Sequence, residues 1–323
     1  MAVPTAKVQG VDKPVSRLVL GTMIVNTRLQ KESNELMDAA FESGFTTLDA
    51  AHVYGGGDTE RAIGRWMAER GNRDSAVVIT KGAHHNADRK RVTDFDIKAD
   101  LHDSLARLGT DYVDLYFLHR DDPDVPAGEI VEWLNELHEQ GKIRAFGGSN
   151  WTCERVCEAN DYALARGLVP FTASSPHFSL AVQVDNPWGP GCTTLTGDGQ
   201  AEARKWYRKT NMPVFAYSSL ARGLLSGRIT RENYKETADG ACQTAYCHEC
   251  NFQRLDRARE LAAEKGVNVP QIAVAYVLNY PLNLFALVGA ASRDEIRQLV
   301  EAAALKLTRE EMAWLNLERQ SRR

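Results

Sequence analysis

The amino-acid sequence predicts an α/β fold in which eight parallel strands, each followed by a helix, close into a barrel. Eight short apolar runs alternate with longer segments of helical pattern, and no linker-like break divides the 323 residues. Several runs are almost continuously apolar, which is typical of parallel strands covered on both faces. The length exceeds the roughly 250 residues of a typical barrel only by two insertions and a final helix. We therefore expect one domain, residues 1–323, with the (β/α)8 or TIM-barrel architecture.

The expected strands occupy residues 18–21, 46–49, 76–80, 112–118, 143–147, 169–173, 213–217 and 285–288. Five expected helices stop immediately before a glycine, the residue that most readily takes the left-handed conformation after a helix. They occupy residues 32–43, 59–70, 97–108, 129–140 and 153–166. The insertions, 180–199 and 226–251, follow the sixth and seventh strands. The last helix, 309–318, has Thr308 as its N-cap and is expected to pack outside the barrel.

A doubly wound open sheet is the alternative architecture, because it shares the alternation of strands and helices. Its dinucleotide-binding form carries a G-x-G-x-x-G motif directly after the first strand. No such motif follows residues 18–21, and Gly55, Gly56 and Gly57 follow the second strand with a different spacing. The closed barrel is therefore favoured.

Composition excludes several classes of protein. The chain has 39 Lys and Arg against 43 Asp and Glu, a net charge of −4, which offers no electrostatic basis for binding nucleic acid. No apolar stretch approaches the roughly 18–20 residues of a membrane helix, and residues 1–20 lack the apolar core of a signal peptide. We expect a cytoplasmic protein without nucleic-acid or membrane partners, and its six cysteines should be reduced thiols.

Polar residues follow three successive strands at their carboxyl ends, where barrel enzymes carry their chemistry. Asp49 and Tyr54 follow the second strand, Lys81 the third and His119 the fourth. A tyrosine, with a pKa near 10, can supply the proton that a carbonyl oxygen needs when the carbon receives a hydride. A lysine beside it would lower that pKa, an aspartate would hold the lysine, and a histidine could orient the carbonyl. This set requires no metal.

Each of these residues also has an ordinary structural explanation. Asp49 could cap a helix or hold a turn, Tyr54 could be an exposed loop residue, and Lys81 could be solvated. His119 could be a hydrogen-bonded core histidine. Their joint placement at three neighbouring strand ends is what favours catalysis.

Five motifs in the same order resemble those of the aldo-keto reductases. They are LDAAHVYG at 48–55, ITKG at 79–82, LYFLH at 115–119, GGSNW at 147–151 and YSSL at 217–220. The resemblance covers nearly the whole chain and implies a (β/α)8 barrel that reduces aldehydes and ketones with NADPH or NADH. It implies Tyr54 as the proton donor, tuned by Asp49 and Lys81, with His119 orienting the substrate.

The resemblance also implies the cofactor site. Ser149 and Asn150 would bind the nicotinamide carboxamide and Tyr217 would stack on the ring, while Ser175 occupies the position where the family usually has glutamine. Ser218, Leu220 and Arg222 would line the pyrophosphate path, with Gly21 and Thr22 under the cofactor. At the adenosine end the matching positions are Gly289, Glu295 and Gln298. Glu295 would repel a 2′-phosphate and could accept from a ribose hydroxyl, so NADH is an option unless Arg293 or Arg297 substitutes.

The loops after the strands should form the substrate pocket. The residues expected to face the substrate are Met23, Trp151, His177 and Trp188, with Phe178 and the 226–251 insertion as further candidates. Several aromatic residues and few charges suggest a neutral, medium-sized carbonyl compound, and sugars or keto-glycosides fit as well as apolar ketones. We expect no metal site. Cys242, Cys247, His248 and Cys250 are expected to be inert loop residues, with a zinc site and a redox switch as alternatives. The His84-His85 pair is expected on the surface of the substrate loop.

The sequence thus predicts an NAD(P)H-dependent carbonyl reductase whose only partner is a small carbonyl or alcohol substrate. One alternative is a cofactor-binding regulatory or redox-sensor subunit resembling the potassium-channel β subunits. A barrel hydrolase or lyase without a nicotinamide cofactor is a further alternative. The physiological carbonyl and the oligomeric state are not predicted.

Overall fold

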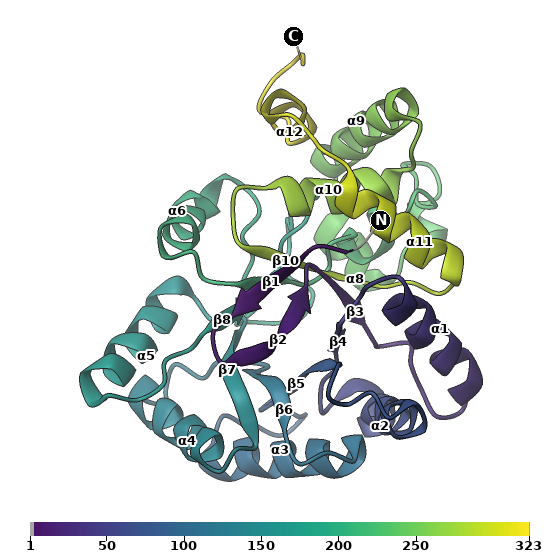
Figure 1. Cartoon of the computed structure of the whole chain (residues 1–323). Helices are drawn as coiled ribbons and strands as arrows, with labels where there is room; N and C mark the ends of the chain where they lie inside the picture. Colours follow the sequence, from purple (N-terminus) through teal and green to yellow (C-terminus); the bar gives the residue numbers. More distant parts are fainter. Residues whose placement is uncertain (1–2, 323) are drawn as a thin grey trace.

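Eight parallel strands form a closed barrel in the computed structural model, which describes residues 3–322. The barrel strands are β3 (Leu18–Gly21), β4 (Thr47–Asp49), β5 (Val77–Gly82), β6 (Val113–Leu118), β7 (Ile143–Ser149), β8 (Ala173–Ser175), β9 (Val214–Ala216) and β10 (Leu284–Val288). Neighbouring strands pair in chain order, and β10 pairs with β3 to close the ring (Figure 1). The (β/α)8 prediction is confirmed, and closure excludes the doubly wound sheet.

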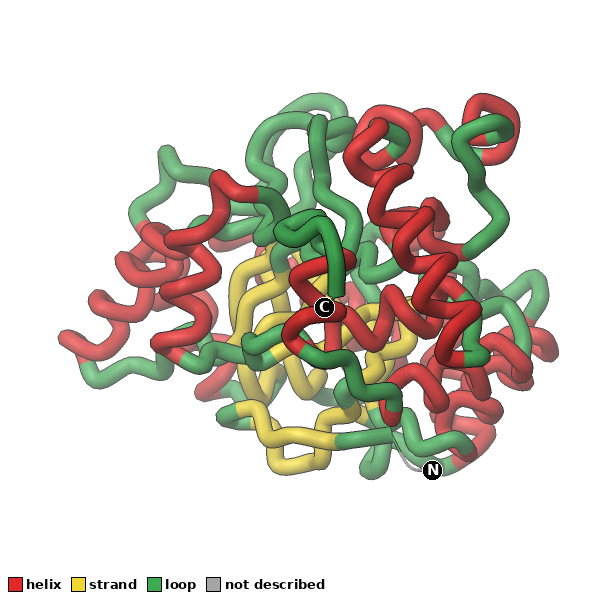
Figure 2. Tube along the Cα trace, turned by 90° about the horizontal axis from the view of Figure 1, so that it is seen from above, coloured by secondary structure: helices red, strands yellow, loops and turns green. Residues whose placement is uncertain are grey.

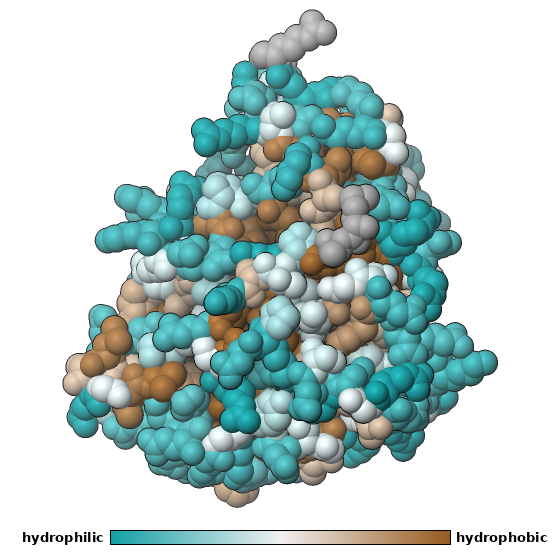
Figure 3. All heavy atoms as spheres, viewed as in Figure 1, coloured by the Kyte–Doolittle hydropathy of each residue, from teal (hydrophilic) through white to brown (hydrophobic). Residues whose placement is uncertain are grey.

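Helices surround the strands, as Figures 1 and 2 show. They include α1 (Gln30–Glu42), α2 (Asp58–Arg70), α3 (Asp94–Leu108), α4 (Ala127–Glu139), α5 (Cys153–Arg166), α6 (Ala201–Thr210), α10 (Val269–Asn279) and α11 (Arg293–Ala304). Apolar side chains between the helices and the outer face of the strands form the larger core, and polar residues cover most of the surface seen in Figure 3. None of the helices in residues 3–322 is both long and apolar enough to span a bilayer.

An antiparallel hairpin that the sequence analysis did not predict closes the amino-terminal end of the barrel. It consists of β1 (Thr5–Val8) and β2 (Val11–Ser16). Val8, Val11 and Val15 join the barrel-interior cluster that contains Phe117, Phe215 and Phe285. Figure 2 shows the hairpin at one end of the strands and the long loops at the other. Because apolar side chains close the hairpin end, we look for a ligand site among the loops at the other end.

The sixth barrel strand lies later in the chain than predicted. It was expected at residues 169–173, but β8 spans Ala173–Ser175. Two helix asparagines cause the difference: Asn135 exchanges hydrogen bonds with the backbone of Val169, and Asn160 does the same with Phe171. Because these amides occupy the backbone groups of Val169 and Phe171, the segment forms no strand ladder.

The two insertions differ in structure. The first, 180–199, is mostly irregular, whereas the second contains α7 (Tyr234–Thr237), α8 (Gly240–Tyr246) and the start of α9 (Glu249–Lys265). The last helix, α12 (Arg309–Leu315), packs against α9 outside the barrel and ends earlier than predicted. Thr308 is its N-cap, and Glu311 completes a capping box, as the sequence suggested.

Candidate active site

A cavity of about 730 Å³ lies at the carboxyl ends of the strands. Most residues that the sequence analysis assigned to the site line it. They are Gly21, Met23, Asp49, Tyr54, Lys81, His119, Ser149, Asn150, Ser175, Trp188, Tyr217, Ser218, Leu220, Arg222, Gly289 and Glu295. The structure thus brings together residues from every barrel strand or the loop that follows it.

Strand register explains why the catalytic candidates converge. Asp49 pairs with Ile79, and Lys81 lies two residues beyond Ile79 on the same face of β5. Lys81 in turn pairs with Phe117, and His119 follows two residues later. Ile79 and Phe117 belong to the barrel interior, so Lys81 and His119 also point inward. The barrel therefore places the three side chains at one mouth.

Asp49, Lys81 and Tyr54 form a connected chain of polar contacts. The Lys81 ammonium lies 2.7 Å from the Asp49 carboxylate and donates to the Tyr54 hydroxyl at 3.3 Å and to the Ala50 carbonyl at 2.8 Å. Tyr54 begins a tight turn in which Gly55, Gly56 and Gly57 all have positive φ, a conformation that glycine adopts without steric cost. This turn brings Tyr54 back over Lys81.

Burial is the largest influence on the pKa values of Tyr54 and Lys81. Burial raises the pKa of Tyr54 above its ordinary value, and the Lys81 charge opposes that rise without cancelling it. The expected effect of Lys81 on this pKa has the predicted direction, but burial outweighs it, so the pKa of Tyr54 does not fall toward neutral pH. Burial also disfavours the Lys81 ammonium, but Asp49 and Tyr54 outweigh it and raise the pKa of Lys81. Tyr54 therefore holds its proton and Lys81 its charge near neutral pH.

His119 is neutral at the cavity wall. Burial, followed by the charge of Lys81, lowers its pKa well below the ordinary value of 6.5. Its ring lies edge-on to Tyr54, with the centroids 6.0 Å apart, and its Nδ1 has no hydrogen-bond partner among the described residues. A neutral imidazole beside Tyr54 can donate one hydrogen bond to a substrate oxygen.

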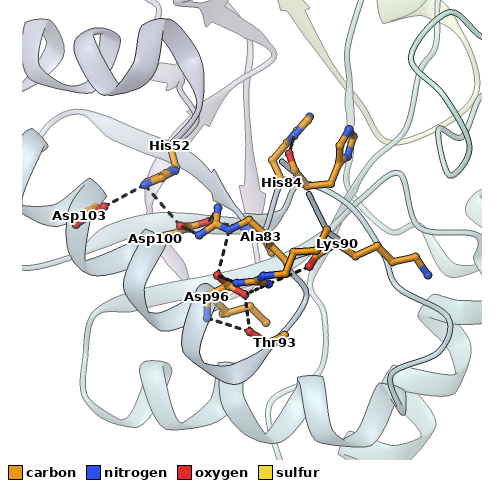
Figure 4. Close-up of polar contacts among 12 residues, drawn as sticks. His52, Ala83, His84, Lys90, Thr93, Asp96, Asp100 and Asp103 are labelled. Carbon is orange, nitrogen blue, oxygen red and sulfur yellow. Dashed lines mark hydrogen bonds and ion pairs between the residues drawn. The ribbon is translucent and has the colours of Figure 1, made fainter. Parts of the chain in front are cut away.

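A network of ion pairs holds the loop after β5 in place (Figure 4). Asp100 accepts from the Ala83 backbone at 2.8 Å and from the Arg91 guanidinium at 2.6 Å. Asp96 binds Arg89, which is the main reason that the pKa of Asp96 falls to about 2. His84, at the start of this loop, lines the cavity with its ring centroid 4.8 Å from that of His119. The network therefore fixes a second histidine beside the catalytic candidates.

The residues expected around the nicotinamide already bind one another. The Tyr217 hydroxyl donates to Asn150 Oδ1 at 2.8 Å, and Asn150 Nδ2 donates to the His119 carbonyl at 3.3 Å. The Ser149 hydroxyl donates to the Ser175 carbonyl, and the Ser175 hydroxyl donates to the Phe215 carbonyl. These bonds fix Tyr217 at the cavity wall and leave the serine hydroxyls as acceptors.

A second cavity, also about 730 Å³, adjoins the first. Leu220, Arg228, Gly289 and Glu295 line both, and Gln298 lines only the second. The two cavities adjoin at these shared residues, and we refer to them together as the groove. Arg222, on the first cavity, is held by Asp239 through contacts of 2.8 and 2.9 Å.

The charges at the far end of the groove differ from those the sequence suggested. Arg293 pairs with Glu42 and Arg297 with Glu301, and neither arginine lines either of these two cavities. Arg228 and Arg259 line the second cavity instead, and the sequence analysis missed both. The only signal for Arg228 is its position shortly after the YSSL motif.

Three predicted site residues lie outside the cavities. Thr22 is buried and its hydroxyl donates to the Asp49 backbone carbonyl at 2.8 Å, so it helps to fix the backbone of Asp49. Trp151 is buried against Phe171, because its ring turns away from the mouth into the helix layer. His177 is fully buried and binds Thr194 at 2.8 Å. The expectation that Trp151 and His177 face the substrate is therefore not met, and buried Phe178 is also absent from the lining.

We expect buried His177 to weaken the fold in acid. Burial lowers its folded pKa to about 3 from 6.5, so the unfolded chain takes up the proton first as the pH falls. Its contribution to stability is complete above about pH 6.5 and declines below it, by about 1 kcal/mol between roughly pH 6.5 and 5.5. Urea unfolding of wild type and His177→Gln should show the shallower pH dependence in the variant. Parallel curves would contradict this prediction, and exposed His85→Gln is the control.

The cysteines remain free thiols. Cys242 and Cys247 lie close together, with 3.9 Å between their sulfur atoms, and His248 binds the Thr244 carbonyl. Within residues 3–322, no three His, Cys, Asp or Glu side chains are arranged to hold a metal ion. The 226–251 insertion instead packs Cys242 and Tyr246 into the apolar core.

The closed barrel, with its groove and the Asp49–Lys81–Tyr54 contacts at the carboxyl ends of the strands, has the arrangement of a barrel enzyme. A model of the aldo/keto reductase family matches residues 17–316, so the chain belongs to that family. It is an NAD(P)-dependent oxidoreductase, and the family uses NADPH or NADH. The resemblance is thereby confirmed, and the motifs that carry it all lie in or directly after barrel strands.

Named relatives cover most of the chain. Aldo-keto reductase YhdN of Bacillus subtilis is 29% identical over 93% of this chain and 89% of its own. Norsolorinic acid reductase A of Aspergillus parasiticus is 29% identical over 92% of this chain and 76% of its own. The structure of glycerol dehydrogenase AKR11B4 from Gluconobacter oxydans has a TM-score of 0.80 and 26% identity, covering 98% of this chain and 94% of its own.

Proposed function

We propose that this protein reduces an aldehyde or ketone, sugars and keto-glycosides included, to the alcohol, with Tyr54 as the proton donor. The observation that carries the proposal is the chain from Asp49 through Lys81 to Tyr54 at the floor of the cavity. Relatives named for reduction of norsolorinic acid and for dehydrogenation of glycerol support carbonyl–alcohol chemistry in general. The free cysteines support a reducing, cytoplasmic location.

Each residue has a defined task in this reaction. When bound, the nicotinamide cofactor would supply the hydride that the carbonyl carbon receives. Tyr54 gives its proton to the carbonyl oxygen, and Lys81 stabilises the phenolate that remains. Asp49 keeps Lys81 charged and in position, and neutral His119 orients the carbonyl oxygen toward Tyr54. The apolar rim around the mouth, which includes Met23 and Trp188, limits the access of water.

The groove could hold the cofactor in an extended form. Tyr217 would face the nicotinamide, Ser218, Leu220 and Arg222 the pyrophosphate, and Gly289 and Gln298 the adenosine. Glu295 and Arg228, which carry opposite charges, both line each of the two cavities. The balance between this carboxylate and this guanidinium therefore sets the preference between NADH and NADPH.

We expect Glu295→Gln to shift this preference toward NADPH. The amide removes a negative charge near the 2′-phosphate and can still accept from the Ala291 backbone, as Glu295 does at 2.7 Å. The ratio of kcat/KM for NADPH to that for NADH should rise about 3- to 10-fold. Asp294→Asn is a matched control, because exposed Asp294 sits on the same helix turn but lines neither cavity. An equal shift in both variants, or no shift, would refute a specific role for Glu295.

The proposed activity is tested by following NADPH and NADH consumption with a panel of aldehydes, ketones and keto-sugars. Consumption should match alcohol formation mole for mole. A protein that binds the nucleotide tightly but converts no carbonyl compound in the panel would argue for the regulatory alternative.

A further inference from the structure

Arg120 is a positive charge in the cavity that the proposed mechanism does not use. It follows His119 directly after β6 and lines the cavity. Its Nη1 donates to the His119 carbonyl at 3.3 Å, while its Nε is buried and has no hydrogen-bond partner among the described residues. Part of this guanidinium is therefore removed from water without a partner in the protein.

The carboxylates near Arg120 are already paired with other cations. Asp121 pairs with Arg155 at 3.2 Å, and Asp122 pairs with Lys90 at 2.6 Å. In the cavity itself, Asp49 is held by Lys81, and Glu295 lies where the second cavity begins. Across residues 3–322, no carboxylate lies within ion-pair distance of Arg120.

The charge of Arg120 acts on the cavity rather than on outside solvent. After burial, which dominates, it contributes to lowering the pKa of His84 and of His119, and it opposes the rise in the pKa of Tyr54. His84, His119 and Tyr54 all line the cavity. Three independent wall positions thus place the guanidinium near the space where the carbonyl would be reduced.

We propose that Arg120 binds an anionic group of the substrate, a carboxylate or a phosphate, and makes the pocket selective for carbonyl compounds that carry one. A guanidinium presents paired donors that match either oxyanion, and such charge-assisted bonds are strong in a partly desolvated site. The inference rests on the proposed reductase activity and names the substrate class of the same site. An anionic carbonyl compound thus replaces the neutral substrate that the sequence suggested. The sequence alone gave no sign that Arg120 lines the pocket.

Matched pairs of aldehydes test this assignment. Succinic semialdehyde is compared with butanal, and phosphorylated with free glyceraldehyde, so that the two pairs distinguish carboxylate from phosphate recognition. In wild type, the anionic member of at least one pair should have the higher kcat/KM. Arg120→Gln should reduce that anionic-to-neutral ratio about 10- to 100-fold, mainly through KM, since a charge-assisted contact is lost. Arg120→Lys keeps the charge but not the planar fork, so its anionic-to-neutral ratio of kcat/KM should lie between those of wild type and Arg120→Gln.

Two controls make the result specific. Arg61→Gln removes an exposed arginine on α2, outside the cavity, and should leave the ratio unchanged. In wild type, added salt should raise KM for the anionic aldehyde more than for the neutral one, a measurement that needs no variant to fold. The proposal is overturned if Arg120→Gln leaves the ratio intact, or if salt affects both members equally.

Failure of the reductase proposal gives a different pattern. If wild type reduces no aldehyde, titration calorimetry of the cofactor-loaded protein with butanoate and with inorganic phosphate still decides the role of Arg120. Binding of either anion by wild type and its loss in Arg120→Gln would support the anion site. Absence of binding to wild type would refute it.

Discussion

Replacing Tyr54 with phenylalanine is expected to reduce kcat for carbonyl reduction about 10²- to 10⁴-fold, the usual contribution of a positioned general acid. The variant keeps the ring that lies over Lys81 and edge-on to His119 and loses only the hydroxyl. Cofactor binding, measured by the change in NADPH fluorescence, should be retained. Steady-state and single-turnover assays would locate the loss in the chemical step.

Tyr162→Phe is the matched control, because its hydroxyl binds Glu132 on the outer helices, far from the cavity lining. Undiminished turnover in Tyr54→Phe would show that another group delivers the proton. It would also reopen the regulatory alternative, in which the cofactor is bound without efficient reduction.

Replacing Lys81 with methionine is expected to affect both catalysis and stability. Without the ammonium, the Tyr54 phenolate loses the cation that contacts its oxygen, so kcat should fall at least about 10²-fold. The change also strands the Asp49 carboxylate in the core, where burial raises its pKa and Lys81 is its ion-pair partner. Breaking a buried pair on one side costs about 3–5 kcal/mol, which urea unfolding near pH 7 would measure.

The double variant Asp49→Asn with Lys81→Met separates the two effects. It removes both charges, so much of the lost unfolding free energy should return while turnover stays low. Recovery of turnover along with stability would mean that Lys81 acts only as a structural partner of Asp49. A fully stable Lys81→Met single variant would show that Asp49 is readily protonated or hydrated.

The catalytic candidates could be predicted because a parallel barrel translates sequence position into spatial position. Asp49, Lys81 and His119 lie at the ends of successive strands. In the strand register, each lies two residues closer to the carboxyl end of the barrel than the one before it. Side chains two residues apart share a face, so the order along the chain already implied that these residues meet. The resemblance implied a role for Tyr54, but only the structure shows the glycine-rich turn that returns Tyr54 to Lys81.

The substrate-facing residues could not be predicted in the same way. Trp151 and His177 follow strand ends, as the catalytic residues do, yet both turn into the core. His177 binds Thr194, which belongs to the first insertion, and packs beneath Tyr217 with ring centroids 5.7 Å apart. Irregular loops have no period that fixes which way a side chain points, so packing against distant segments decides it.

The sequence by itself therefore indicated the barrel through its strand periodicity and order, and its motifs carried the resemblance to the family and the prediction of the Asp49–Tyr54–Lys81–His119 set. Only the tertiary structure decided how the barrel is closed by the β1–β2 hairpin and which residues line the groove. It also showed that Arg120 has no ion-pair partner in the described chain while Asp121 and Asp122 do. The physical reason is that the pairing of charges depends on which side chains approach one another through space, and neighbours in sequence do not reveal it.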